Sequence, residues 1–130
     1  MRAIVVVTTV GTEEQAYLIA REIVARRQAA CVNILPGVRS IYRWKGKIRK
    51  DGELLLIIKT LEGEFEEVAA TIRELNSYEL PEILSFTVTQ AEARFLDWIA
   101  GNVDKEADFP DDDDDEEDEE IAFAGVDDDD

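Results

Sequence analysis

Residues 31–60 read CVNILPGVRSIYRWKGKIRKDGELLLIIKT. Both halves are rich in β-branched and other apolar residues, and Lys45-Gly46-Lys47 between them can turn the chain, so the stretch predicts a β-hairpin. Pro36-Gly37 interrupts the first arm, and we expect a bulge or an edge bend there because proline lacks a ladder donor. In the second arm, Asp51-Gly52 predicts either a second turn or a bulge.

The hairpin is longer than the strand that precedes it. Ala3 to Val7 is a β-branched apolar run followed by Thr8-Thr9, which predicts a strand buried on both faces or lying centrally in a sheet. Because each hairpin arm has several more residues than this strand, the far end of the hairpin should project beyond its own sheet. Projecting hairpins are usually covered by another subunit, so we expect an oligomer.

Three amphipathic segments predict helices. Thr12 followed by Gln15 has the form of a capping box, and the helix that it begins should end near Arg26 and Arg27. Apolar residues then recur at helical spacing in two segments, namely Ala16, Ile19, Ala20, Ile23 and Val24 in the first and Phe65, Val68, Ala69, Ile72 and Leu75 in the second. A short third helix within 91–102 would pack through its aromatic residues.

The order of these elements indicates the fold class. Residues 83–89 predict a fourth strand. Its odd-numbered side chains alternate with the apolar side chains of Leu84, Phe86 and Val88, so one face of this strand should be buried. The resulting order β-α-β-β-α-β is the split βαβ or ferredoxin-like arrangement, an α+β fold. Right-handed crossovers would place both main helices on one face of a four-stranded antiparallel sheet. The long hairpin and the C-terminal helix are additions to that frame.

Charge divides the chain into two parts. The formal net charge is −17, and residues 104–130 hold 17 acidic residues and one basic residue, whereas residues 1–103 are nearly neutral. We therefore expect a folded domain over 1–103 and an acidic tail over 104–130. Ten consecutive carboxylates at 111–120 repel one another, so the tail should be disordered and solvating, with at most loose cation binding. The apolar island Ile121–Val126 is a candidate to dock on a partner.

The absence of histidine excludes several chemistries. Ser-His-Asp and Cys-His catalytic systems, HExxH metalloprotease helices and His-ligated zinc sites all need an imidazole that this chain lacks. A single cysteine, Cys31, allows neither an internal disulfide nor a CxxC zinc site, and it suits a reducing compartment. The apolar run at Ala3–Val7 is far too short for a membrane span or a signal-peptide core. We expect a cytoplasmic protein that does not bind membranes.

Cations gather on the hairpin. Six of them lie within twelve residues, namely Arg39, Arg43, Lys45, Lys47, Arg49 and Lys50. A solvated strand whose charges protect an edge from aggregation explains them. Nucleic-acid binding is not expected, because the domain is nearly neutral and the tail would repel phosphates. A further hypothesis is that the acidic tail folds back over this hairpin, in the same subunit or a neighbouring one.

Several spaced motifs are typical of one protein family. Residues 29–37 read AACVNILPG, and residues 40–48 read SIYRWKGKI. They resemble the AACVNI-x-PG strand and the S-x-Y-x-W-x-G-x-[IV] hairpin of the CutA family, the divalent-cation-tolerance proteins. Leu55–Thr60 is similar to the closing L-x-x-x-KT motif. Residues 78–83 (YELPEI) and 95–99 (FLDWI) are similar to the family's entry to the last strand and to its C-terminal helix. The resemblance covers residues 1–103 and leaves the tail unmatched.

The resemblance implies a ferredoxin-like homotrimer in which each long hairpin reaches a neighbouring subunit. It also implies a role in tolerance of copper and other divalent metals, and a likeness to the PII signalling trimers suggests a ligand-sensing role. Where the family has been assigned a metal site, it uses a histidine and a thiol at the positions of Asn76 and Thr8 in this sequence. Neither residue is a good soft-metal ligand, so no metal ligand is assigned here and a divalent metal such as copper would bind weakly.

The resemblance also implies a pocket between subunits. Its candidate ligand-binding residues are Cys31, Trp44, Lys59, Tyr78 and Glu79. Each of these residues has an alternative role. Cys31 is either a small buried hydrophobic residue or a Cu(I) ligand. Trp44 and Tyr78, like Tyr42 and Trp98, would pack in the core or an interface, and Lys59 and Glu79 would form a salt bridge. No catalytic residue is assigned. The competing hypotheses are an enzyme with Glu79 as general base and Tyr78 or Lys59 as acid, and a scaffold that presents three acidic tails.

Overall fold

The computed structural model describes residues 1–106, and the expectations for the rest of the acidic tail lie outside the described residues. The elements follow the predicted order. They are β1 (Ala3–Val10), α1 (Glu13–Ala25), β2 (Cys31–Trp44), β3 (Lys47–Leu61), a 3-10 turn (Glu62–Glu64), α2 (Phe65–Leu75), β4 (Leu84–Thr87) and α3 (Ala93–Asn102).

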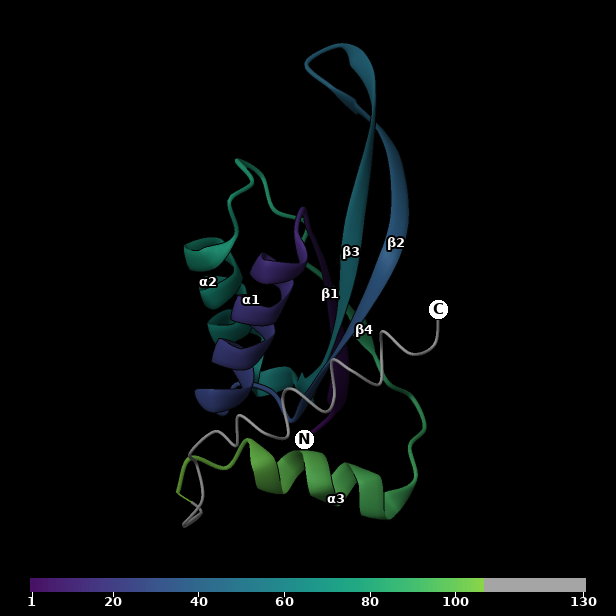
Figure 1. Cartoon of the computed structure of the whole chain (residues 1–130). Coiled ribbons are helices and arrows are strands. Elements are labelled where there is room, and N and C mark those ends of the chain that lie inside the picture. The colour runs from purple at the N-terminus through teal and green to yellow at the C-terminus, as the bar shows by residue number, and fades with distance from the viewer. Residues whose placement is uncertain (107–130) are drawn as a thin grey trace, which may run out of the picture.

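The four strands form one antiparallel sheet in the order β2-β3-β1-β4, which confirms the ferredoxin-like α+β fold. Helices α1 and α2 lie side by side on one face of this sheet, as right-handed crossovers require (Figure 1). Helix α3 lies across the end of the sheet where the chain begins (Figure 1). The opposite face of the sheet therefore has no main helix over it.

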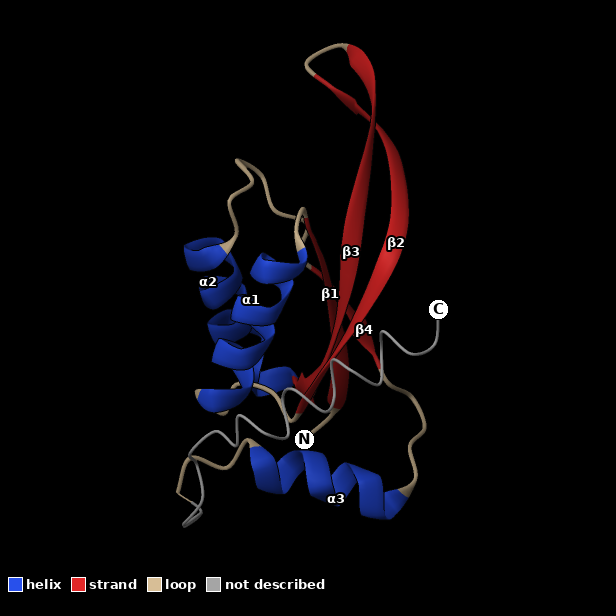
Figure 2. Cartoon of the chain, in the orientation of Figure 1, coloured by secondary structure: helices blue, strands red, loops and turns tan. Residues whose placement is uncertain are grey.

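The hairpin projects as predicted. Strands β2 and β3 have 14 and 15 residues, whereas β1 has 8, and pairing of β3 with β1 stops at Leu54. Beyond that point the hairpin is a two-stranded ribbon (Figure 2). The register shifts between Leu35 and Val38, which confirms the bulge, and Gly37 there has a φ of 80°. Lys45 and Gly46, at φ 50° and 79°, make the turn.

The expectation of a second turn or bulge at Asp51-Gly52 is wrong. Both residues continue β3, because Asp51 is in register with Ser40 and Gly52 with Arg39. A bulge needs an extra residue on one strand, and the bulge in β2 already accounts for the one irregularity of this ladder among the described residues.

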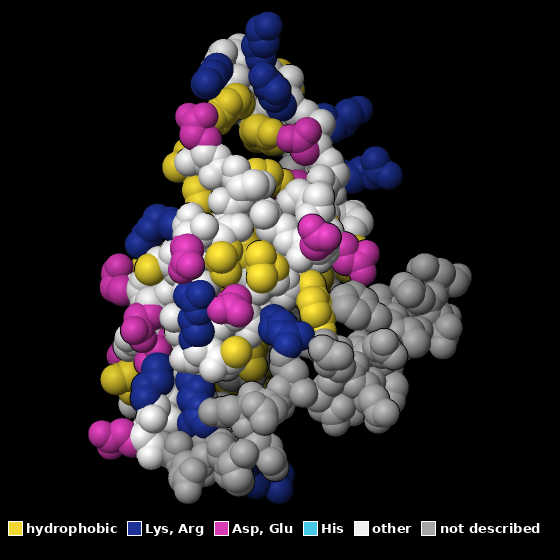
Figure 3. Space-filling model, turned by 60° about the vertical axis from the view of Figure 1, so that its left-hand side comes forward, with side chains coloured by type: hydrophobic (Ala, Val, Ile, Leu, Met, Phe, Trp, Pro, Cys, Tyr) yellow, Lys and Arg dark blue, Asp and Glu magenta, His cyan; other side chains and the backbone are white. Residues whose placement is uncertain are grey.

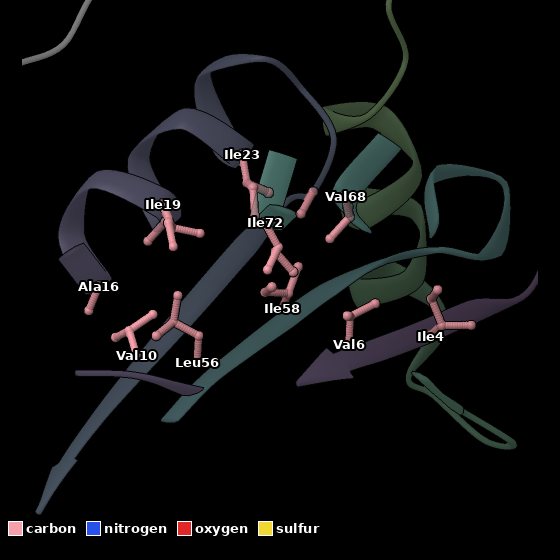
Figure 4. Close-up of a cluster of buried hydrophobic side chains, with 12 residues drawn as sticks. Ile4, Val6, Val10, Ala16, Ile19, Ile23, Leu56, Ile58, Val68 and Ile72 are labelled. Atoms are coloured by element: carbon pink, nitrogen blue, oxygen red, sulfur yellow. The ribbon is translucent and has the colours of Figure 1, made fainter. Parts of the chain in front are cut away.

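The core lies between the two helices and the sheet. Five large side chains are fully buried there, from α1, β3 and α2: Ile19, Ile23, Leu56, Ile58 and Ile72 (Figure 4). Alternate residues of β1, including Val6 and Val10, complete it because a strand directs every second side chain to one face. The predicted apolar face of α1 is confirmed except for Val24, which is 41% exposed.

The capping box at the start of α1 is half correct. The Thr12 side chain accepts a hydrogen bond from the Gln15 backbone N–H at 3.1 Å. The Gln15 side chain does not return that bond. Its Oε1 instead accepts from the backbone N–H and hydroxyl of Ser77, which ties the start of α1 to the segment after α2.

The open face of the sheet is apolar. Cross-strand partners share a face, so Phe86 lies with Val5 and Leu84 with Val7, opposite the core residue Val6. Phe86 and Leu84 are 54% and 52% exposed, and α3 adds the half-exposed Phe95 and Trp98. The prediction that one face of the fourth strand is buried is therefore wrong for a single chain, because α3 leaves β4 uncovered.

Candidate functional site

Tyr78 joins the segment between α2 and β4 to the base of the projecting hairpin. Its hydroxyl donates to Oε2 of Glu53 at 2.7 Å. Gly11, just after β1, makes room for the ring, because a Cβ at that position would lie 3.3 Å from the Tyr78 oxygen. This contact forms where β1 ends and β3 continues beyond it. The Tyr78–Glu53 hydrogen bond therefore supports the first residues of the unpaired ribbon.

Asn76 fixes the backbone that carries Tyr78. Its Nδ2 donates to the carbonyl oxygen of Thr9 at 3.1 Å, and its Oδ1 accepts from the Tyr78 backbone N–H at 2.9 Å. The side chain is buried, and both of its polar ends are used within the chain. Asn76 therefore acts as a structural connector between β1 and the α2–β4 segment.

Carboxylates and phenols gather around this contact. The pKa of Tyr78 lies well above its ordinary value. Burial of the phenol is the larger cause, and the hydrogen bond to Glu53 is the second. Partial desolvation and the charge of Glu53 raise the pKa of Glu82. Further along the ribbon, the Tyr42 hydroxyl donates to Oδ2 of Asp51, and that bond raises the pKa of Tyr42. The phenols keep their protons at neutral pH and serve as hydrogen-bond donors.

Cys31 and Lys59 lie together at the other end of the sheet. They are partners in the β2–β3 register, both half-buried on the open face. The Lys59 ammonium is 5.9 Å from the centroid of the Phe95 ring, which stacks on Trp98 at 5.4 Å. Within residues 1–106 no carboxylate pairs with Lys59. The result is a cation beside a thiol and beneath aromatic rings.

The five predicted pocket residues occupy three places in one chain. Trp44 precedes the hairpin turn, and the 14 residues of β2 place it on the order of 40 Å from Cys31 at about 3.3 Å per residue. Tyr78 is at the hairpin base, and Glu79 beside it is exposed. Only Cys31 and Lys59 are cross-strand neighbours. A single pocket from all five residues therefore requires more than one subunit.

Sequence reasoning missed Glu53 and Glu82 at this site. A signal for Glu53 existed, because it shares its strand face with Leu55 and Ile57, where a charge needs a partner. That partner, Tyr78, is 25 residues away in the chain, and spacing could not identify it.

The positions that the resemblance assigns to a metal do not fit a soft metal. Asn76 has both polar ends engaged, and Thr8 is fully buried with a hydroxyl that has no hydrogen-bond partner among the described residues. Copper and zinc prefer thiolate or imidazole ligands. Residues 1–106 also contain no group of three or more Cys, Asp or Glu side chains placed to hold an ion.

Comparisons with known proteins give one family. Residues 4–102 match the model of the CutA1 divalent ion tolerance protein family. The chain is 43% identical over 98 residues to the divalent-cation tolerance protein CutA of Thermus thermophilus, which covers 75% of the chain and 95% of that relative. It is 38% identical over 97 residues to the chloroplastic protein CutA of Arabidopsis thaliana, where it spans 75% of the chain and about half (53%) of the relative.

The fold is also shared with solved structures. A periplasmic divalent cation tolerance protein CutA from Archaeoglobus fulgidus superimposes with a TM-score of 0.77 at 33% identity, over 78% of this chain and 99% of that one. In the described part of the chain, no helix is long and apolar enough to cross a membrane. The family match spans the whole ferredoxin-like domain, including the long hairpin and α3. The alignment also covers 95% of the Thermus relative. The chain belongs to the CutA1 divalent ion tolerance protein family.

Proposed function

We propose that this CutA-family chain is a homotrimeric binding and sensing module in divalent-cation homeostasis. The observation that carries the assembly is the open face of the sheet. Four large apolar side chains on β4 and α3 are 44–54% exposed there, namely Leu84, Phe86, Phe95 and Trp98. Large apolar side chains that are exposed in this way usually mark an interface, and the unpaired ribbon of the hairpin can complete a neighbour's sheet.

The ligand pocket lies between subunits in this proposal. The exposed hairpin end of one subunit carries Trp44 to the neighbour's Lys59 or to its Tyr78 and Glu79. Lys59 supports a ligand or partner group with negative charge, because it has no carboxylate partner within residues 1–106. A PII-like small-molecule sensor is the variant of this function that the Lys59 environment favours.

A catalytic role is the weaker proposal. Tyr78 would be a poor proton donor because its proton is held by Glu53 and its pKa is raised. Glu79 is exposed, whereas a catalytic base usually works in a site that excludes water. We therefore propose binding rather than chemistry. We also propose a reducing compartment such as the cytoplasm, although relatives include proteins named chloroplastic and periplasmic.

Sedimentation of the full chain tests the assembly. A trimer should sediment at about three times the 14.7 kDa chain mass, and a well-folded single subunit would contradict the proposal. Calorimetric titration with Cu(I) and Zn(II), in excess Mg²⁺ to saturate the tail carboxylates, tests the metal. We expect weak binding by the wild type and tight binding by a Thr8→Cys/Asn76→His double variant. Tight stoichiometric binding by the wild type would contradict the reading of Thr8 and Asn76 as structural residues.

A further inference from the structure

Helix α3 packs on its own chain through one narrow stripe of side chains. Among residues 93–103 only Ile99 and Val103 are buried. Phe95 belongs to the same stripe, because residues four positions apart lie on one side of a helix. Phe95 lies at one end of the stripe, with its ring centroid 5.9 Å from the Lys59 ammonium, and Val103 lies at the other. The contacts that hold the Val103 end therefore decide where the Phe95 ring lies.

Polar contacts fix that end of α3 to the end of α1. The Lys105 Nζ donates to the carbonyl oxygen of Arg27 and lies 2.8 Å from Oε1 of Glu64, the last residue of the 3-10 turn. In return, Nη1 of Arg27 donates to the carbonyl oxygen of Asp104 at 3.2 Å. We call these contacts of Arg27, Lys105 and Glu64 the clamp. It joins the chain after α3 to α1 and to the start of α2.

The backbone of Arg27 is in a conformation that favours glycine. Its φ is 58°, and the backbone N–H groups of Arg27 and Gln28 donate to the carbonyl oxygens of Val24 and Ile23, which ends α1 in a Schellman motif. Glycine would close the helix there without strain, but it would supply no guanidinium for the Asp104 carbonyl. Strain that a simpler residue would remove indicates that the arginine side chain is used.

We propose that Arg27 and Lys105 are positioning residues for Lys59, because they hold α3 so that the Phe95 ring lies beside the Lys59 ammonium. The inference rests on the proposed function, in which Lys59 meets a negatively charged group. Phe95 and Val103 are eight positions apart, which is about 12 Å along a helix. A tilt of about 10° at the clamp thus moves the ring by about 2 Å. The contact is already near the limit of about 6 Å for a cation–π interaction, so such a tilt breaks it.

The ring prepares Lys59 for binding. A lysine ammonium sits on a flexible four-carbon stem, and attraction to an aromatic face restricts the positions that the ammonium visits. A group that is already restricted loses less freedom when it binds a ligand or partner. The clamp and the Lys59–Phe95 contact both lie within one chain, so the argument needs no exposed surface.

Arg26 provides a matched control for Arg27. The two arginines are adjacent at the end of α1, but the Arg26 guanidinium pairs with Glu22 at 2.9 Å and with Glu74 of α2 at 3.2 Å. Figure 3 turns the helical side forward and shows acidic and basic side chains interspersed there, as such pairs require. Loss of Arg26 should therefore weaken the pairing of α1 with α2 and leave the position of α3 unchanged.

NMR spectra of the full chain test the proposal through the ε-methylene protons of Lys59. The ring current of Phe95 displaces their resonances, and a Phe95→Leu variant gives their position without the ring. An Arg27→Gly/Lys105→Met variant should move these resonances toward the Phe95→Leu position. Arg26→Met should leave them at the wild-type position. Arg27→Lys should also retain them, because a lysine keeps a donor for the Asp104 carbonyl.

The single variant Arg27→Gly separates positioning from stability. It relieves the backbone strain, so its melting temperature should not fall, yet the Lys59 resonances should still move in the Phe95→Leu direction. Wild-type Lys59 resonances in an Arg27→Gly/Lys105→Met variant that circular dichroism shows to be folded would overturn the proposal. An equal displacement in Arg26→Met would also overturn it.

Titration with inorganic phosphate keeps this inference apart from the proposed function. Lys59 resonances of the wild type that do not respond to phosphate count against an anion site at Lys59. A displaced Lys59 resonance in the Arg27→Gly/Lys105→Met variant still supports the clamp in that case. Sedimentation of the same samples reports on the assembly, and an unchanged sedimentation coefficient shows that the displacement arises within the subunit.

Discussion

Tyr78 stabilises the fold through a proton that its surroundings retain. Its unfolded pKa is about 10, and the folded value is higher because of burial and Glu53. The stabilisation is therefore complete below pH 10 and is lost as the pH rises through the folded pKa. The sequence indicates Tyr78 as a site residue but does not predict this hydrogen bond. Its partner, Glu53, lies 25 residues earlier in the chain, and the two residues meet only in the folded structure.

Substitution of Tyr78 by Phe should show this pH dependence. At pH 8 we expect a loss of about 1 kcal/mol in the free energy of unfolding, the worth of a typical hydrogen bond. The difference from the wild type should shrink between pH 10 and 12, because only the wild type loses the Tyr78 proton. Urea titrations at a series of pH values, at one fixed protein concentration, measure it. A difference that stays constant over this range would contradict the assignment, and Glu53→Gln should reduce the pH dependence in parallel.

Asn76 should matter for stability rather than for metal binding. Asn76→Ala leaves the Thr9 carbonyl and the Tyr78 N–H without their partner, and an unsatisfied buried group costs about 1–3 kcal/mol. Asn76→Asp keeps the acceptor but places a carboxylate against the Thr9 carbonyl, so its stability should recover as the pH falls. Thermal unfolding at pH 7 and pH 4.5 compares the three chains. Equal melting temperatures for wild type and Asn76→Ala would show that these bonds are dispensable.

At the scale of elements, local patterns predicted most of the fold. The apolar spacing of α1 and α2, the Pro36-Gly37 bulge and the Lys45-Gly46 turn are all confirmed, because each depends on neighbours in sequence. Asp51-Gly52 was misread because its composition suits a turn. The long pairing of β3 with β2 overrides that preference, and a tertiary contact of this kind has no local signature.

Two glycines within the strands of the ribbon, Gly37 and Gly52, separate backbone strain from packing. Neither has any atom within 4 Å of where a Cβ would lie, but only Gly37 has a left-handed φ, of 80°. Gly37→Ala should therefore destabilise the protein by about 1 kcal/mol through strain, whereas Gly52→Ala should be nearly neutral. Urea unfolding of both variants at matched concentration measures the difference. Equal stability of the two variants would show that the bulge relaxes without strain.

At the scale of the whole molecule, a single chain leaves large apolar side chains of β4 uncovered. The helices cover one face of the sheet, and the other face presents Phe86 at 54% exposure beside α3. The length of the hairpin predicts that the subunit needs a partner, and the alternating pattern of β4 predicts that one of its faces is buried. A sequence pattern does not distinguish burial in the core of one subunit from burial between subunits.

Phe86 and Leu18 provide the matched test of that surface. Both are exposed apolar residues, at 54% and 45%, but Phe86 lies on the open face and Leu18 on α1, on the helical side. In the proposed trimer, Phe86→Asp should cause dissociation into folded subunits, because a desolvated carboxylate in an apolar interface is strongly unfavourable. Leu18→Asp should leave the sedimentation coefficient unchanged. Circular dichroism confirms folding of both variants. A trimeric Phe86→Asp variant would place the interface elsewhere, on the ribbon rather than on the sheet.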